Sequence, residues 1–221
     1  MLRRLFIVTM LATALLGFAQ PSRAQGTISY HQPSSPIILW TQGFAEYYPF
    51  DIDDNGTSEL TFAYNFQSIG ILYEQNTRTL SLMSPWPSIR GVPQPLPADF
   101  RIGPDSSSGQ LQWFGGIPGE PVGSYGLVFI SGTGASGSFA GQHAYMGIEF
   151  QRNGASHYGW MLLQVSGSFA AVAAIESWAW ETRPGEAILA GTVPEPSTWA
   201  LLVGGGVLML WFRRKRHEGR G

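Results

Sequence analysis

The residues best suited to chemistry lie in one short segment, Asp51-Ile52-Asp53-Asp54-Asn55-Gly56-Thr57-Ser58-Glu59. Counted from Asp51, side chains with oxygen stand at positions 1, 3, 5 and 9, namely Asp51, Asp53, Asn55 and Glu59, and Gly56 stands at position 6. Ca²⁺ takes roughly six to eight oxygen ligands, and a glycine permits the tight turn that gathers them. The spacing therefore predicts a Ca²⁺ loop in which Thr57, at position 7, offers its backbone carbonyl.

The segment is not an EF-hand, because its position 12 is Phe62, where a bidentate Glu is required. It resembles the shorter D-x-D-x-D-G-x-x-D loops of extracellular β proteins. Asn55 and Glu59 replace two aspartates of that pattern, which predicts a modest affinity. The alternative is a bare turn, since Asn-Gly between alternating segments is a strong hairpin signal. The two interpretations are compatible, because the tip of a hairpin can hold an ion.

Catalytic chemistry has little support in the rest of the chain. There is no Cys and no G-x-S-x-G nucleophile motif. His31, His143 and His157 are scattered without the spacing of metal ligands, and His157 is expected to be a hydrogen-bonded structural residue. A glycosidase needs two carboxylates beside a cleft, but an acidic chain offers such pairs by chance. We therefore expect no enzyme, and a secreted polysaccharide hydrolase is the second alternative function.

Aromatic side chains suggest a different kind of site. The apolar faces of sugar rings stack on aromatic rings, while polar groups around them take hydrogen bonds. Tyr47 and Tyr48 add to six tryptophans between residues 25 and 193. Most of these are expected to pack in the core. Trp86 stands between two prolines, which exclude a central strand, so Trp86 is the candidate glycan platform. A lectin-like carbohydrate-binding module is thus the first alternative function.

The composition predicts how these residues are held. The 221 residues include 28 Gly and 15 Pro, and 44% are hydrophobic but only 13% charged. Such a chain favours short strands joined by turns. Alternation is clearest at 59–66, and the run from Pro85 to Pro104 is expected to be an ordered loop or an edge crossing. The expected strands are 37–41, 59–66, 69–74, 79–83, 110–114, 125–131, 144–151, 157–166 and 169–181. They predict an all-β domain over 25–193, an antiparallel β-sandwich of the jelly-roll kind.

Charge is distributed unevenly along the chain. The formal net charge is −2, but residues 25–193 hold five arginines and thirteen acidic residues, a net charge of −8. This excludes nucleic-acid binding through a basic surface. The remaining basic residues cluster beside apolar runs at the two ends, as in targeting segments.

The N-terminal 24 residues have the layout of a secretory signal peptide. Arg3 and Arg4 precede a 14-residue apolar helix over 5–18, and small residues lead to Ala24, after which we expect cleavage. The alternative is an uncleaved anchor helix, which the short apolar run disfavours.

The C-terminal 28 residues form a three-part segment: Pro194-Glu195-Pro196, an apolar stretch over 197–212, and Arg213-Arg214-Lys215-Arg216. The stretch is expected to be a single transmembrane helix, and the basic end places the tail, 217–221, on the cytoplasmic side. The alternative is an ordinary single-span anchor with a chance Pro-Glu-Pro. The segment 194–216 resembles the PEP-CTERM sorting signal of Gram-negative bacteria.

This resemblance implies that an exosortase, a membrane cysteine protease, recognises the tripeptide and removes the tail. It implies a protein first anchored in the inner membrane and then found at the cell surface or outside the cell. Because the family accompanies exopolysaccharide and biofilm gene sets, the expected role is a structural or adhesive one among exopolysaccharide or other matrix proteins. Residues 157–191, with His157-Tyr158-Gly159-Trp160, also resemble the end of a common PEP-CTERM ectodomain, to which no activity is attached.

Overall fold

Three long strands form the centre of the fold: β12 (His143–Arg152), β13 (Ala155–Val165) and β14 (Val172–Glu181). β12 and β13 pair antiparallel around the turn Asn153-Gly154, whose two residues have φ angles of 53° and 77°. Positive φ at both positions is what a two-residue hairpin turn requires. The computed structural model describes residues 28–40, 45–65, 67–74, 76–83, 91–116, 125–131, 134–167 and 172–194.

These strands belong to the larger of two main sheets. On one side, β14 pairs with both β1 (Ile28–His31) and β2 (Ile37–Trp40). On the other side, β12 pairs with β6 (Arg78–Met83), which in turn pairs with β7 (Gly91–Pro93) and β9 (Leu111–Gly115).

The second sheet has five strands in the order β11-β10-β5-β4-β3. They are β3 (Glu46–Phe50), β4 (Leu60–Asn65), β5 (Ser68–Tyr73), β10 (Tyr125–Ser131) and β11 (Gly134–Ser136). In β4 the alternation seen in the sequence is real, since Leu60 and Phe62 are fully buried while Thr61 and Ala63 are only partly covered. A two-stranded sheet of β8 (Arg101–Ile102) and β15 (Ile188–Leu189) and the 3₁₀ helix η1 (Pro104–Ser106) complete the described elements.

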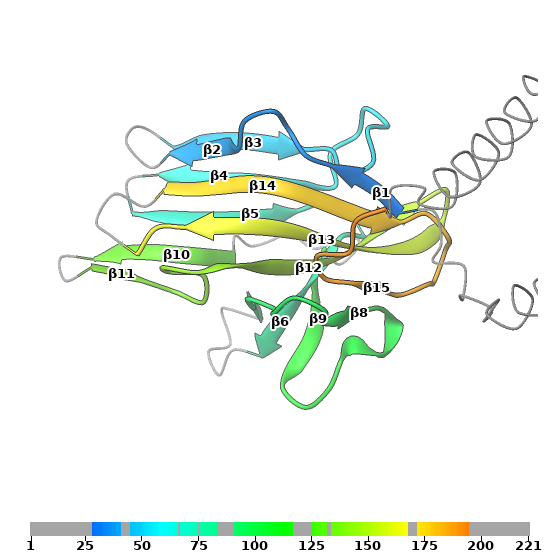
Figure 1. Ribbon diagram of the computed structural model, residues 1–221. Helices are drawn as coiled ribbons and strands as arrows, with labels where there is room; N and C mark the ends of the chain where they lie inside the picture. The colour runs from blue at the N-terminus through cyan, green and yellow to red at the C-terminus, as the bar shows by residue number, and fades with distance from the viewer. Residues whose placement is uncertain are drawn as a thin grey trace, which may run out of the picture.

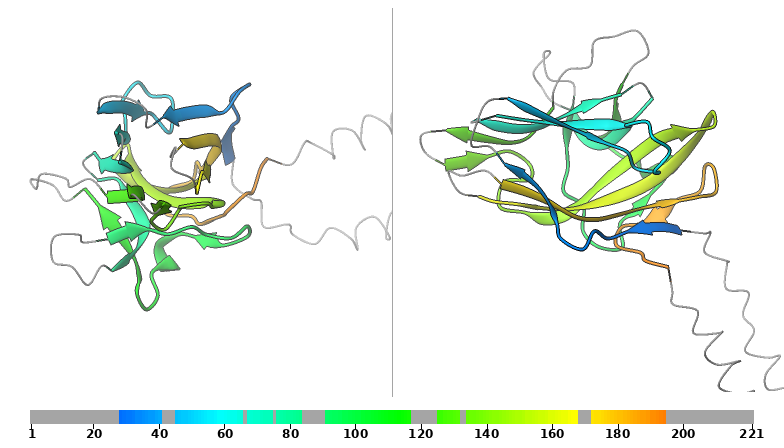
Figure 2. Two further views of the ribbon diagram at one scale, coloured as in Figure 1. Left: turned by 90° about the vertical axis from the view of Figure 1, so that its left-hand side faces the viewer. Right: turned by 90° about the horizontal axis from the view of Figure 1, so that it is seen from above.

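The main hydrophobic core lies between the two large sheets. Phe62 and Ile71 of the five-stranded sheet and Phe150 and Ile175 of the larger sheet belong to one buried cluster. Seen from above, the cyan strands β3–β5 and the yellow to orange strands β13 and β14 form separate layers (Figure 2). The inward face of each sheet is therefore its apolar face, while Tyr47 and Phe129 are exposed on the outward face of the five-stranded sheet.

The central strands of the larger sheet are covered on their other face too. A second buried cluster joins Tyr158 and Trp160 of β13 to Leu96, Ile102 and Ile188. The described part of the proline-rich run, 91–104, thus packs over the sheet through Leu96 and Ile102. This explains why β13 is buried almost continuously instead of at every second residue.

The all-β expectation is confirmed, since every strand pair in the described residues is antiparallel and η1 is the one helical turn among them. Each expected strand has a counterpart, displaced by up to three residues at its ends. The sequence reasoning missed the short strands β1, β3, β7, β8, β11 and β15. The proline run is only partly a loop, because β7 pairs at the edge of the sheet, where Pro93 is tolerated.

The first described strand, β1, and the segment after β15 lie at the same end of the molecule (Figures 1 and 2). Among the residues described, no helix has the length and apolar character needed to cross a membrane. The expected signal helix with its cleavage at Ala24 and the expected transmembrane helix over 197–212 lie outside the described residues.

Candidate metal centre

The acidic segment forms the loop between β3 and β4. The two strands pair up to Phe50 and Leu60, so the loop runs over nine residues, 51–59, and is longer than a two-residue Asn-Gly turn. The chain reverses through two residues of positive φ, Asp54 at 56° and Gly56 at 88°. The alternative of a hairpin is therefore correct in topology, but the loop is large enough to enclose a site.

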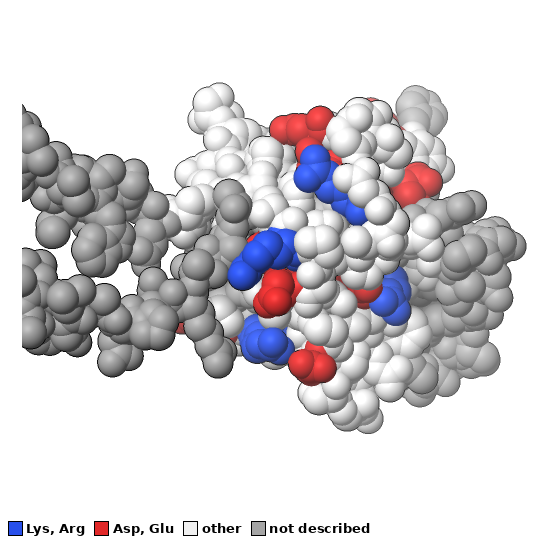
Figure 3. Space-filling view, turned by 90° about the vertical axis from the view of Figure 1, so that its right-hand side faces the viewer, with Lys and Arg blue, Asp and Glu red and all other residues white. Residues whose placement is uncertain are grey.

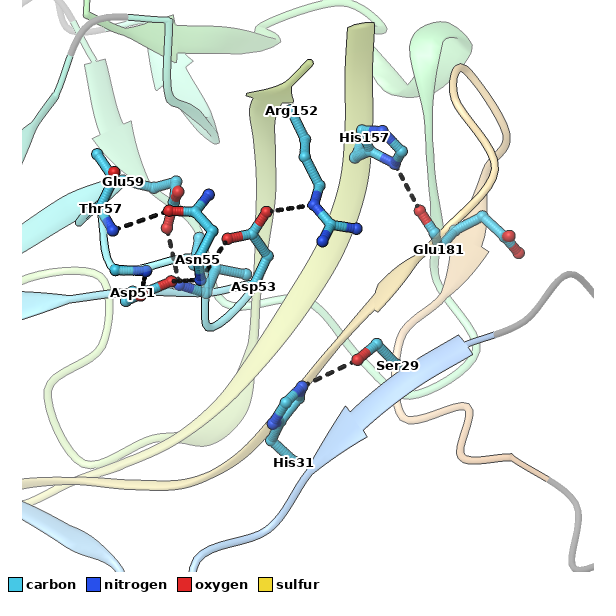
Figure 4. A network of polar contacts seen from close by, with 12 residues as sticks. Ser29, His31, Asp51, Asp53, Asn55, Thr57, Glu59, Arg152, His157 and Glu181 are labelled. Atoms are coloured by element: carbon cyan, nitrogen blue, oxygen red, sulfur yellow. Dashed lines mark hydrogen bonds and ion pairs between the residues drawn. The ribbon is translucent and has the colours of Figure 1, made fainter.

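Side chains of the loop bind its own backbone. Asp51 Oδ2 accepts a hydrogen bond of 2.6 Å from Gly56 N–H, and Asp51 Oδ1 and Asp53 Oδ1 each accept one of 3.2 Å from Asn55 N–H. Glu59 Oε2 accepts one of 2.7 Å from Ile52 N–H. These bonds turn the carboxylates toward the interior of the loop (Figure 4).

Three of the five predicted ligands are brought together. One carboxylate oxygen each of Asp51, Asp53 and Glu59 lies within 4.8 Å of the other two. Asn55 and Thr57 are exposed in the same loop, where Asn55 Oδ1 accepts a 2.8 Å hydrogen bond from Thr57 N–H. Asp53 is 8% and Glu59 is 7% exposed, so two of the clustered carboxylates have lost most of their water.

Crowding and burial change the acidity of Glu59. Burial, together with the negative charges of Asp53 and Asp51, raises the pKa of Glu59 to about 7, against the opposing hydrogen bond from Ile52 N–H. A carboxylate that resists ionisation beside two others is the response expected when like charges share a dry site. A bound cation would reverse this response, because it stabilises the ionised forms of all three.

Arg152, at the end of β12, supports the loop from the other sheet. Its Nε lies 2.7 Å from Asp53 Oδ2, and its guanidinium carbon lies 4.8 Å from the ring centre of Trp180. Arg152 is thus held between a buried carboxylate and an aromatic face. The pair occupies Oδ2 of Asp53 and leaves Oδ1 on the loop side, where Asn55 N–H contacts it.

Trp178 of β14 holds the loop at a second point. Its Nε1–H donates a 3.1 Å hydrogen bond to the carbonyl of Ile52, whose side chain is 2% exposed. The ring of Trp178 also stacks on His31 of β1, with centroids 5.2 Å apart and planes 2° from parallel. Sequence reasoning missed Arg152 and Trp178, because no local motif marks either of them.

The basic side chains of the described residues lie beside acidic ones. Each arginine among the described residues, Arg78, Arg101, Arg152 and Arg183, lies within 4.0 Å of a carboxylate. On the face shown in Figure 3, blue basic groups accordingly lie next to red acidic ones. The described arginines therefore form local pairs, and the excess negative charge of the domain lies on the remaining carboxylates.

The other residues considered from the sequence have structural contacts. His157 is 4% exposed and its Nδ1 lies 2.9 Å from the carbonyl of Glu181, as expected of a structural histidine. His143 pairs with Glu176 at 3.0 Å on the surface. Pro194 is exposed at the last described position. Trp86 and the rest of the sorting signal (Glu195, Pro196, Arg213, Arg214, Lys215 and Arg216) lie outside the described residues.

Comparison with known proteins adds no constraint. No protein-family model, no curated protein and no solved structure matches the chain.

Replacing Gly56 with Ala tests whether the shape of the loop matters for binding. Gly56 has a φ of 88° and no atom within 4 Å of an added Cβ, so the cost is backbone strain alone, about 1 kcal/mol of unfolding free energy. Gly185→Ala is the matched control, because Gly185 has a φ of 73° and equally open surroundings away from the loop. Chemical unfolding with chelator should show similar losses, whereas only Gly56→Ala should weaken Ca²⁺ binding in a titration. Equal Ca²⁺ affinities in the two variants would contradict the site.

Proposed function

We propose that this chain is an exported, non-enzymatic protein whose β domain binds Ca²⁺ in the β3–β4 loop and serves a structural or adhesive role at the cell surface or in the extracellular matrix. The observation that carries the proposal is the clustering of Asp51, Asp53 and Glu59 within 4.8 Å. Carboxylate oxygens are hard ligands, which suit Ca²⁺ and not the softer transition metals.

The loop supplies a plausible ligand count for Ca²⁺. Three carboxylates, the side-chain oxygen of Asn55 and the carbonyl of Thr57 give five protein groups, and water or a bidentate carboxylate completes the shell. The irregular, nine-residue geometry favours Ca²⁺ over Mg²⁺, since Mg²⁺ demands a near-ideal octahedron and retains most of its water.

The ion would act as a clamp between the layers. The loop already contacts the larger sheet through Arg152 and Trp178. A cation among the three carboxylates removes their mutual repulsion and stabilises the folded state by mass action. A chain with no cysteine has no disulfides for this task, so a metal clamp is a reasonable source of stability outside the cell.

The jelly-roll-like sandwich is part of the same proposal. It is supported by the core shared between the two sheets and by the way the chain passes from one sheet to the other, at β2–β3, β5–β6, β9–β10 and β11–β12.

Export and sorting are proposed from the sequence of the two ends. A leader removed after Ala24 and a tail processed by an exosortase at Pro194-Glu195-Pro196 would carry the domain through the inner membrane to the surface, among exopolysaccharide and other matrix proteins. The arrangement of the domain is compatible with this route, since β1 and the segment after β15 lie at the same end (Figure 2).

The intact mass of the protein recovered from cell-surface and extracellular fractions of its native host tests this route. The expected mass corresponds to a chain that begins after Ala24 and ends between Val193 and Pro196. A mass that retains Arg213 to Gly221 would contradict the sorting proposal and indicate a stable membrane-anchored protein instead.

A further inference from the structure

The outward face of the five-stranded sheet carries two exposed aromatic residues. Tyr47 on β3 is 64% exposed and Phe129 on β10 is 46% exposed. The strand register places Tyr47 opposite Ala63, Ala63 opposite Gly70, and Gly70 opposite Gly126. Residues directly opposite one another share a face of the sheet, so the floor between the two aromatic residues is built from small residues.

Phe129 lies opposite Ser68, in the row next to that of Tyr47, but its ring reaches back toward the Tyr47 row. A Cβ added at Gly126 would collide with the ring of Phe129, so that ring leans over Gly126 and into the row that begins with Tyr47. The row crosses from β3 to β10, which is three inter-strand spacings, or about 14 Å. The two rings therefore flank the two strands that lie between them, β4 and β5.

A hollow of about 180 Å³ lies beside Tyr47. It is lined by Ala45, Glu46, Tyr47, Ala63, Tyr64, Asn65, Ser68 and Leu72. Its volume is well below the roughly 300–1,000 Å³ of pockets for drug-sized ligands, so it suits one small ring. The apolar atoms of Ala63 and Leu72, with the amide of Asn65 and the hydroxyl of Ser68 nearby, match a sugar ring, which has apolar faces and polar edges.

The charge of this face selects among polysaccharides. The five strands contain no Lys, Arg or His, and their one acidic residue is Glu46, which accepts a 2.8 Å hydrogen bond from Tyr64 O–H. A polymer of uronic acids would meet no counter-charge on these strands. Glu46 precedes Tyr47 on β3 and therefore points to the opposite face, where its partner Tyr64 packs against the main core. A neutral polymer needs no counter-charge for binding, so the lack of basic residues on these strands does not weaken its binding.

We propose that this face binds a neutral polysaccharide chain, with Tyr47 and Phe129 as stacking platforms and one sugar unit in the hollow beside Tyr47. The proposal rests on the proposed surface role only in that the polysaccharide is met outside the cell. It gives that role a ligand class and a site separate from the Ca²⁺ loop.

Affinity electrophoresis of the protein recovered from its host tests the proposal, with soluble glucan, mannan and galactan as neutral probes and polygalacturonate as the acidic probe. We expect retardation by at least one neutral polymer and none by polygalacturonate. Tyr47→Ala and Phe129→Ala should each weaken the interaction about three- to tenfold, and the double variant should abolish it. Tyr47→Phe should retain it, because the ring is kept.

Ile38→Ala is the control, since Ile38 is 50% exposed on β2 of the other sheet. Absence of binding to all three neutral polymers, or unchanged binding by the double variant, would overturn the proposal. The proposal would also be overturned if the parent protein binds no polysaccharide but forms a dimer that the double variant does not form. That result would identify the face as a contact between two copies of the chain. If the protein has the expected processed mass but binds no neutral polysaccharide, this proposal fails and the proposed export stands. If an unprocessed chain binds a neutral polysaccharide, the sorting proposal fails and this site stands.

Discussion

Raising the pH from 4.5 to 7 is expected to destabilise the calcium-free protein through Glu59 by about 3 kcal/mol. The folded state raises the pKa of Glu59 from 4.5 to about 7, so the folded protein binds this proton more tightly than the unfolded chain. The resulting stabilisation is fully present below pH 4.5 and is lost as the pH rises through 7. Urea unfolding between pH 4.5 and 8 with chelator measures it.

Glu59→Gln isolates this contribution, because glutamine has a similar shape and does not titrate. The difference in unfolding free energy between the parent protein and Glu59→Gln should change by about 3 kcal/mol over this range in chelator. With Ca²⁺ the direction reverses, since the ion binds the ionised carboxylates and its affinity rises with pH. A pH-independent difference between the two proteins would contradict the account of Glu59.

The second large effect is expected from Arg152→Ala, which should lower the unfolding free energy by about 2 kcal/mol. The substitution leaves Asp53, whose side chain is fully buried, without the partner now 2.7 Å away, and it removes the contact with Trp180. Breaking a fully buried pair costs about 3–5 kcal/mol, and the 38% exposure of the Arg152 side chain reduces this figure. Thermal and chemical unfolding in chelator provide the measurement.

Arg101→Ala is the matched control for this experiment. Arg101 and Asp105 are 3.7 Å apart with side-chain exposures of 58% and 83%, so their pair should contribute less than about 1 kcal/mol. Ca²⁺ should restore part of the stability lost in Arg152→Ala, because the ion supplies the positive charge that Asp53 has lost. Similar losses in both variants would show that Arg152 does not support the loop.

Much of the fold followed from local patterns. The alternation through Phe62 predicted β4, and Asn153-Gly154 marked the hairpin of β12 and β13. β3 was missed because its sequence is short, contains Pro49 and lacks alternation. β7 and β8 were missed because they lie among prolines and their pairing depends on distant strands, β6 for β7 and β15 for β8, and not on their own composition.

The candidate sites were likewise predictable only where their residues lie close together in the sequence. Asp51, Asp53 and Glu59 were predictable because nine consecutive residues place them in one loop. Trp178 was not, since it is 126 positions from Ile52 and meets it only when the two sheets pack. Tyr47 was noted as aromatic, but its partnership with Phe129 depends on strand order and register, which composition does not encode.

Calorimetric titration of the protein with Ca²⁺, repeated in two buffers of different ionisation enthalpy, is the decisive test of the Ca²⁺ site in the β3–β4 loop, because it measures stoichiometry and proton release together. We expect one ion per chain, with about 0.9 proton released at pH 6 and about 0.1 at pH 8, as Glu59 gives up its proton. Asp53→Asn should weaken binding strongly. Absence of binding at millimolar Ca²⁺, or binding with no proton released at pH 6, would contradict a calcium site built on Asp51, Asp53 and Glu59.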